Sequence, residues 1–223
     1  MASKQESSVV NLPALQLEHF TLNIVGDSPL ISHAWSEKAK QMMLNKQQKK
    51  AATAKEIRRP WVEFADSLYW LTPKPNFDGL TNKEASEILL DIIPKSQFGF
   101  PVIAFKAAAL DAGYQQRVLV RNAGTNDLAK TTARGAFHLM GDFAVIEGLP
   151  TMREDMARIG AGTADLRYRG EFKSWRTTLF ITYNASVVSQ EQIVNLFRLG
   201  GFANGVGEWR PSKDGSFGTF HVE

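Results

Sequence analysis

The last part of the chain constrains the fold most, because it is dense in glycine. Residues 200–218 read GGFANGVGEWRPSKDGSFG. Glycine adopts positive φ angles freely and lets another backbone come close, so this density predicts a shaped loop. We expect it to follow a helix and to lead into a strand over Phe217 to Val222. The loop lacks the Gly-Lys-Ser/Thr ending of a phosphate-binding P-loop, so ATP chemistry is not expected.

Composition excludes several classes of protein. The chain has 223 residues, enough for one medium domain or for one domain with an insertion. It has no cysteine, which excludes disulfides and thiolate metal sites. The longest apolar stretch, Phe100 to Leu110, is short and contains Lys106, so no membrane span is expected. We expect a cytoplasmic protein without cofactor or metal, and its net charge of +3 is only mildly basic.

A basic helix is expected near the start of the chain. Residues 1–14 predict a flexible lead, and alternation over Leu15 to Val25 predicts a strand. The helix would run from Ser36 to Arg59 and end at Pro60. Its charge run is typical of a solvated arm, but it could also contact phosphates. The secondary binding candidates on this helix are Lys38, Lys40, Lys46, Lys49 and Lys50.

Three further helices are expected. One covers Asn82 to Ile93. An alanine-rich core helix opens at Phe100-Pro101 and ends at Gly113. In the third, Ser189 and Gln192 form a capping box, and the helix ends at Gly200.

A charged strand is the most readable part of the second half. Over Ala164 to Lys173, apolar and charged residues alternate, which predicts one apolar and one charged face. This pattern fits an ordinary half-exposed strand or a basic surface that holds a phosphodiester backbone. Thr151 to Gly162 before it predicts an exposed loop or hairpin, and Phe143 to Leu149 and Thr177 to Tyr183 predict two more strands.

Nucleic acid is the partner that these charges favour. Arginine and lysine neutralise phosphates, and aromatic rings stack on bases. Trp209 fits this role but could equally be a core residue beneath the glycine loop. The candidate contacts are Arg167, Tyr168, Arg169, Lys173, Trp175 and Arg176 along the charged strand, Trp209, Arg210 and Lys213 in the glycine loop, and Lys106, Arg153 and Arg158 elsewhere.

The chain resembles the RAMP superfamily, in particular the repeated backbone subunit of CRISPR effector complexes. The similar segments are GDSPLISH (26–33), FPVIAFKAAALDA (100–112), GEFKSWRTTLFITYN (170–184) and the glycine loop with its strand. The amino-acid sequences of residues 28–43 and 152–175 are also similar to segments of phage-encoded proteins. The region from Ser36 to Ile93 matches nothing in this family.

The element order predicts an α+β chain, and the resemblance implies a ferredoxin-like or RRM-like RAMP core of antiparallel sheet with packed helices. We therefore expect one such domain over residues 15–223, with a basic helical insertion at about 36–93.

The expected function is non-enzymatic binding of single-stranded DNA or RNA. The protein would form a homo-oligomer, a ring or filament, along the strand in phage replication, recombination or RNA handling. A phage protein that acts on a host defence complex is an alternative. The resemblance also leaves open a metal-independent ribonuclease with His33 as its base, although no catalytic motif is visible.

Overall fold

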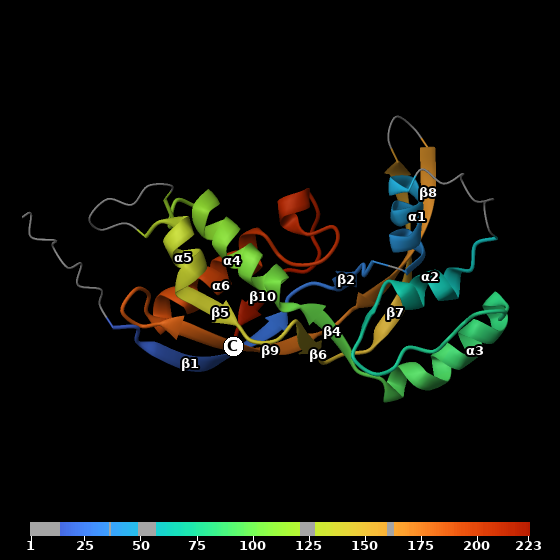
Figure 1. Cartoon of the computed structure of the whole chain (residues 1–223), viewed down its shortest axis with the longest axis horizontal. Coiled ribbons are helices and arrows are strands. Elements are labelled where there is room, and N and C mark those ends of the chain that lie inside the picture. Colours follow the sequence, from blue (N-terminus) through green and yellow to red (C-terminus); the bar gives the residue numbers. More distant parts are fainter. Residues whose placement is uncertain (1–13, 36, 49–56, 121–127, 160–162) are drawn as a thin grey trace, which may run out of the picture.

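The computed structural model describes residues 14–35, 37–48, 57–120, 128–159 and 163–223. Figure 1 shows an elongated molecule with two parts. In one part, helices α4, α5 and α6 lie on one side of a sheet. The other part contains helices α1, α2 and α3 and a long hairpin that rises from the body.

The first part is built on a four-stranded antiparallel sheet with the order β10-β1-β9-β5. Helix α4 lies between β1 and β5 in the chain, and α6 lies between β9 and β10. These elements therefore follow the order βαββαβ, which with this strand order is the ferredoxin-like arrangement. The prediction of a ferredoxin-like α+β core is confirmed. The elements are β1 (Leu17–Gly26), α4 (Val102–Gln115), β5 (Phe137–Leu139), β9 (Arg176–Asn184), α6 (Gln190–Ala203) and β10 (Phe220–Val222), with α5 (Lys130–Ala136) leading into β5.

Helices α4 and α6 pack very closely, and glycine makes this possible. A Cβ atom at Gly200 would lie 2.7 Å from the backbone of Ala109. Gly113 similarly faces Leu196 across the same interface. Both glycines lie inside their helices, so the predictions that they end the helices were wrong. The predicted capping box at Ser189 is present.

The second part comes from two long insertions in this core. One insertion separates β1 from α4, and the other separates β5 from β9. They pair with each other in two three-stranded sheets, β2-β8-β7 and β3-β4-β6. The strands are β2 (Leu30–Ser32), β3 (Tyr69–Trp70), β4 (Phe98–Pro101), β6 (Phe143–Ile146), β7 (Pro150–Ile159) and β8 (Thr163–Phe172).

The helices of this part differ from the sequence prediction at one point. Pro60 was expected to end a long basic helix, but it is the first residue of α2, where its missing N–H costs no hydrogen bond. The described part of the basic helix, α1, ends at Gln47. The helical elements here are α1 (Glu37–Gln47), α2 (Pro60–Asp66), α3 (Asn82–Ile92) and the 3₁₀ turn η1 (Ile93–Lys95); a second 3₁₀ turn, η2 (Pro211–Lys213), lies in the glycine loop.

Residues 151–162 were predicted as an exposed loop or hairpin; their described part is strand β7, which pairs with β8 as a hairpin. The faces of β8 are not the predicted ones. Alternation in β8 predicted buried apolar and exposed charged residues. Leu166 is in fact exposed, whereas Arg169 is 6% exposed. The reason is that β2 pairs with one end of β8 and α2 packs against it, so its charged face is covered there.

Aromatic rings join the two parts into one core. Phe100 of β4 contacts Phe105 of α4, with ring centroids 6.0 Å apart. Phe105 of α4 contacts both Trp175 and Phe220. No helix within the described ranges combines the length and the apolar character that crossing a membrane requires.

The close packing of α4 on α6 leads to a stability prediction. Gly200→Ala should destabilise the protein by about 1–3 kcal/mol, because the new methyl group meets backbone atoms that cannot move aside. Gly135→Ala is the control, since it also lies in a helix but has no atom within 4 Å of the new methyl group. That control should be neutral or should stabilise by about 0.5–1 kcal/mol. Urea unfolding measures both, and equal stability of the two variants would contradict this account of the packing.

Candidate functional site

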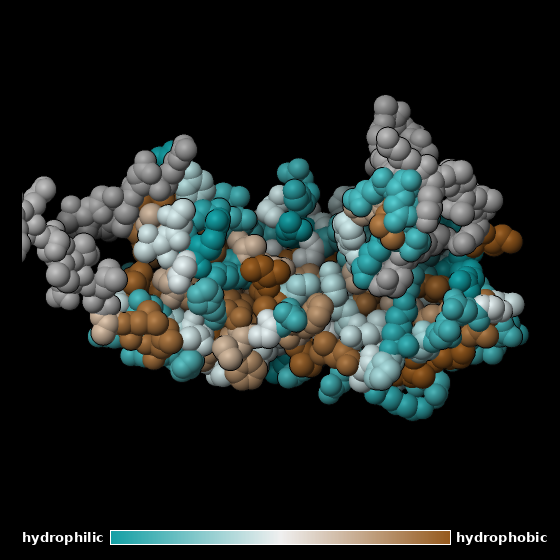
Figure 2. Space-filling model, viewed as in Figure 1, coloured by the Kyte–Doolittle hydropathy of each residue, from teal (hydrophilic) through white to brown (hydrophobic). Residues whose placement is uncertain are grey.

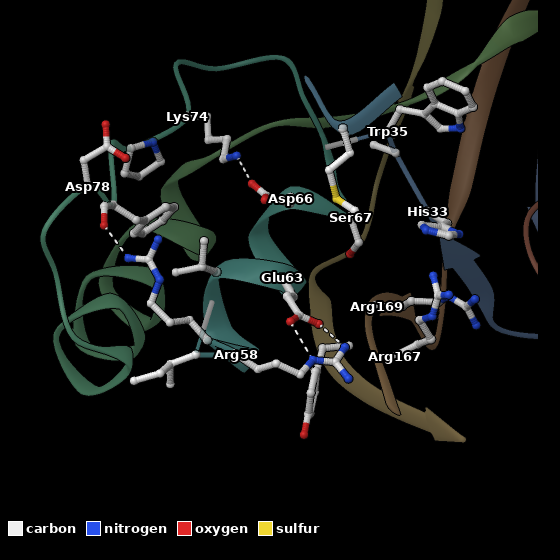
Figure 3. A pocket seen from close by; sticks show the side chains of 18 of the residues that line it. His33, Trp35, Arg58, Glu63, Asp66, Ser67, Lys74, Asp78, Arg167 and Arg169 are labelled. Atoms are coloured by element: carbon white, nitrogen blue, oxygen red, sulfur yellow. Dashed lines mark hydrogen bonds and ion pairs between the residues drawn. The ribbon is translucent and has the colours of Figure 1, made fainter. Parts of the chain in front are cut away.

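A cleft of about 900 Å³ lies within the second part of the molecule, between α2 and strand β8. Its walls are α2, the loop at 74–78, the end of β2 with residues 33–35, and residues 165–169 of β8. Figure 3 shows Arg167 and Arg169 close to His33 on one side of this cleft, with Glu63 and Arg58 on the other.

Strand β8 supplies two arginines to the cleft. Arg167 and Arg169 are two residues apart on a strand, so they point to the same side. Arg169 is almost fully buried, and its Nη1 atom lies 3.4 Å from an oxygen of Asp155. Its buried Nε atom has no hydrogen-bond partner among the described residues. A buried N–H group without a partner costs about 1–3 kcal/mol, so an anion that reached this group would be favoured.

The glycine loop places a carboxylate beside the same cleft. Nδ1 of His33 lies 3.2 Å from Oε1 of Glu208. A carboxylate can only accept, so Nδ1 donates in this contact, and in the neutral ring Nε2 is then the acceptor. This hydrogen bond is the largest cause of the lowered pKa of Glu208, and the charges of Arg169 and Arg210 lower it further.

Carboxylates fix the arginines on the opposite wall. Arg58 forms ion pairs with Glu63 at 2.6 Å and with Asp165 at 2.9 Å. Its hydrogen bond with Glu63 is the main reason that its pKa is raised. Asp165 is shared, because Arg167 also lies 2.8 Å from it. Charge in the cleft is therefore nearly balanced, and the arginines are held in place.

Two arginines near the cleft are bound without an acid. Arg59 donates to the carbonyl oxygens of Phe77 and Leu80. Arg210 donates to the carbonyl oxygen of Gly207 and to the hydroxyl of Ser212. These carbonyl and hydroxyl oxygens are uncharged, so they do not neutralise the positive charges of Arg59 and Arg210.

Aromatic side chains also line the cleft. Tyr168 lies beneath the guanidinium of Arg58, which is 5.8 Å from its ring centroid. Trp35 is 63% exposed and lies near His33 (Figure 3). Rings in such positions can stack on bases. Tyr168 was predicted as a candidate from the sequence, and Trp35 was not.

Two predicted contacts lie inside the protein. Lys106 donates to the carbonyl oxygens of Arg134 and Phe137, and burial lowers its pKa. Trp175 packs against Gly26, and its Nε1 donates to the carbonyl oxygen of Ser28. Neither presents a group to a ligand, so we leave both out of the candidate site.

Other predicted residues lie away from the cleft. Arg153 pairs with Asp155 and Glu171 and stacks on Phe217, which ties the hairpin to the glycine loop. Trp209 is 40% exposed and Lys213 is exposed, both in that loop. Lys173 and Arg176 are exposed at the end of β8 and the start of β9.

Several predicted basic residues are only partly described. Arg158 lies on β7, and Lys38 and Lys46 lie on α1, with side chains outside the described part. Lys40 is exposed on α1, whereas Lys49 and Lys50 lie outside the described residues.

Sequence reasoning missed Glu208 and Trp35, and what distinguishes Glu208 is the backbone around it in the structure. Glu208 is the first acid in the glycine loop and lies between two special backbone positions, since Gly207 has φ 82° and Trp209 has φ 53°. A bulky residue in this conformation is strained, which often accompanies a shaped site. As to metals, the described residues contain no group of three or more His, Cys, Asp or Glu side chains placed to hold an ion.

Comparisons with known proteins give little help. No family model matches the chain, and no curated protein matches it. Among solved structures it is similar to Cmr6 from Pyrococcus furiosus, with a TM-score of 0.33 and 10% identity over 94% of this chain and 100% of that chain. A relationship to the RAMP superfamily therefore stays a prediction.

Proposed function

We propose that this protein binds single-stranded nucleic acid in the cleft between α2 and β8, without catalysing a reaction. The observation that carries the proposal is the buried guanidinium of Arg169, whose Nε lacks a partner within the described residues and which lies next to His33. A phosphate group is an anion that can accept from such a donor.

The rest of the cleft suits a flexible strand. Phosphates would lie on Arg167 and Arg169, next to His33, while unstacked bases would reach Tyr168 and Trp35. Single-strand binders combine these two kinds of contact and tolerate many sequences. Because the charge of the cleft is nearly balanced, overall electrostatic attraction is weak. We therefore expect the strand to be held by contacts to a few phosphates.

Self-association along the strand is the second part of the proposal. In the described part of the chain, no helix covers the outer face of the core sheet, and apolar side chains are exposed there. They continue from β1 and β9 onto β6, because Glu147 pairs with Arg176 and joins the two sheets. Figure 2 shows apolar residues along the lower rim, where Figure 1 places these strands. The exposed apolar residues of this outer sheet face are Leu17, Met140, Phe143, Val145 and Phe180.

A role in phage replication, recombination or RNA handling rests on the sequence resemblance alone. It stays a prediction, as does a location in the cytoplasm.

The β8 arginines lead to a binding prediction. Replacing Arg167 and Arg169 together by Ala should weaken binding to a labelled single strand. The dependence of log K on log salt should fall by about 0.7 for each phosphate contact that is lost. Fluorescence anisotropy at several salt concentrations measures both effects. The control is the double variant Arg198→Ala and Lys83→Ala, which removes the same charge from exposed helical positions.

Equal salt dependence of the two double variants would contradict the proposed site. If the wild-type protein binds neither DNA nor RNA at low salt, the proposed function is wrong. Thermal melting checks that each variant folds. The same samples test the ribonuclease alternative, which the accepting Nε2 of His33 keeps open. Shortening of RNA in EDTA by the wild type, lost in His33→Ala, would replace the non-enzymatic proposal.

The outer sheet face leads to a prediction on assembly. Phe180→Asp should lower the mass of the protein measured by light scattering in the presence of a strand, because a charge in an apolar interface is costly. Phe202→Asp is the control, since Phe202 is exposed on α6, on the other side of the sheet. An unchanged mass in Phe180→Asp, or a monomeric wild type on the strand, would contradict self-association through this face.

A further inference from the structure

A second cavity adjoins the cleft and shares His33 with it. It has a volume of about 350 Å³, which is in the range of small-molecule sites. Its walls come from β3, the first turns of α4 and the glycine loop. Tyr69 and Phe100 lie on one side of it, with ring centroids 5.7 Å apart, and Val206 and Ala104 add apolar surface.

One acceptor at this cavity is the side-chain oxygen of Asn204. Asn204 is 3% exposed, and its Nδ2 donates to the carbonyl oxygen of Ala108. This contact fixes the orientation of the amide and leaves Oδ1 as the atom facing away from Ala108. Oδ1 is buried and has no partner among the described residues.

Glu208 is the second acceptor. It lines the same cavity, and its charge, after burial, is a cause of the raised pKa of Tyr69. Its own pKa is lowered by the hydrogen bond with His33 above all, so it is ionised at neutral pH. A carboxylate has two oxygens, and one contact to His33 leaves capacity for another donor.

Some of the donors at the cavity are already engaged. Arg210 donates to Gly207 and Ser212. Nδ1 of His33 donates to Glu208. The two acceptors are open to a ligand that brings N–H groups, together with a flat body that fits between rings and apolar side chains.

We propose that this cavity holds one base of the bound strand, and that the base is guanine. A nucleotide carries its base and its phosphate on one sugar, so two adjoining sites that share His33 can take both from one nucleotide. The Watson–Crick edge of guanine presents two neighbouring donors, N1–H and N2–H₂, to the two acceptors. Adenine, cytosine, uracil and thymine each place a ring nitrogen acceptor or a carbonyl oxygen beside their donor, which a carboxylate repels. This inference rests on the proposed binding of a single strand.

The test compares two short strands by fluorescence anisotropy at low salt. One is a uniform oligothymidylate, and the other has a guanine in place of one central thymine; the same pair is made in RNA with uracil. Wild-type protein should bind the guanine strand about tenfold more tightly, the usual discrimination of one bidentate base contact. A third strand with adenine at the same place should behave like the uniform one.

Two variants locate the preference. Ala107→Phe adds a ring at an exposed position of the cavity wall, and it should bring the ratio of the two affinities to about one. Glu208→Gln keeps the shape but replaces one acceptor oxygen by a donor, and it should reduce the ratio several-fold. Glu191→Gln, at an exposed position in the first turn of α6, is the control and should keep the ratio of the wild type. Thermal melting checks that each variant is folded.

The outcomes separate the two proposals. Equal affinity of wild type for the two strands overturns the guanine site and leaves strand binding intact. No binding of either strand overturns the proposed function as well. A guanine preference that persists in both Ala107→Phe and Glu208→Gln places the base elsewhere and overturns this inference. If Ala107→Phe fails to fold, Glu208→Gln decides alone.

Discussion

The glycine loop lies directly against β2, and the candidate site depends on this contact. A Cβ atom at Gly207 would come 2.6 Å from the carbonyl oxygen of Ile31, so only glycine fits there. The next amide, of Glu208, donates to that same oxygen at 3.0 Å. At the other end of the loop, the amide of Gly218 donates to Pro29. The loop is therefore held along the strand that leads to His33, which brings Glu208 to the imidazole and lets one residue serve two cavities.

The arginines of the cleft are held in fixed positions by carboxylates, and these carboxylates also offset much of their positive charge. Asp165 is shared by Arg58 and Arg167, and Asp155 is shared by Arg153 and Arg169. Each of these carboxylates holds two guanidinium groups, so neither guanidinium has the carboxylate to itself. Such a network prepares donors for an anion before it arrives, which reduces the ordering cost of binding. Affinity would then depend on geometry at Arg169 more than on the modest net charge of +3.

Local patterns predicted the elements, and tertiary contacts decided the exceptions. Alternation located β1 and β9, and the capping box located α6. Gly200 and Gly113 resemble helix ends in sequence, but a packing requirement explains them, and this requirement is visible only when the partner helix is in place.

The candidate site was also predictable only in part, namely where a local sequence pattern marks its residues. Arg167, Tyr168 and Arg169 were found because the charges alternate along one strand. Trp175 follows the same charged strand but turns into the core against Gly26, and Lys106 turns toward backbone carbonyl groups. Glu208 and Trp35 come to the cleft through the pairing of a loop and a strand that are far apart in sequence. No local pattern carries that information.

The most direct test of the account is where a bound strand touches the protein. Ultraviolet cross-linking of the wild-type protein to a single strand, followed by mass spectrometry of the peptides, locates these contacts. We expect cross-links in residues 33–35, 165–169 and 204–212, which line the cleft and the adjoining cavity. Cross-links confined to the outer face of the core sheet, around Phe180, would contradict the account.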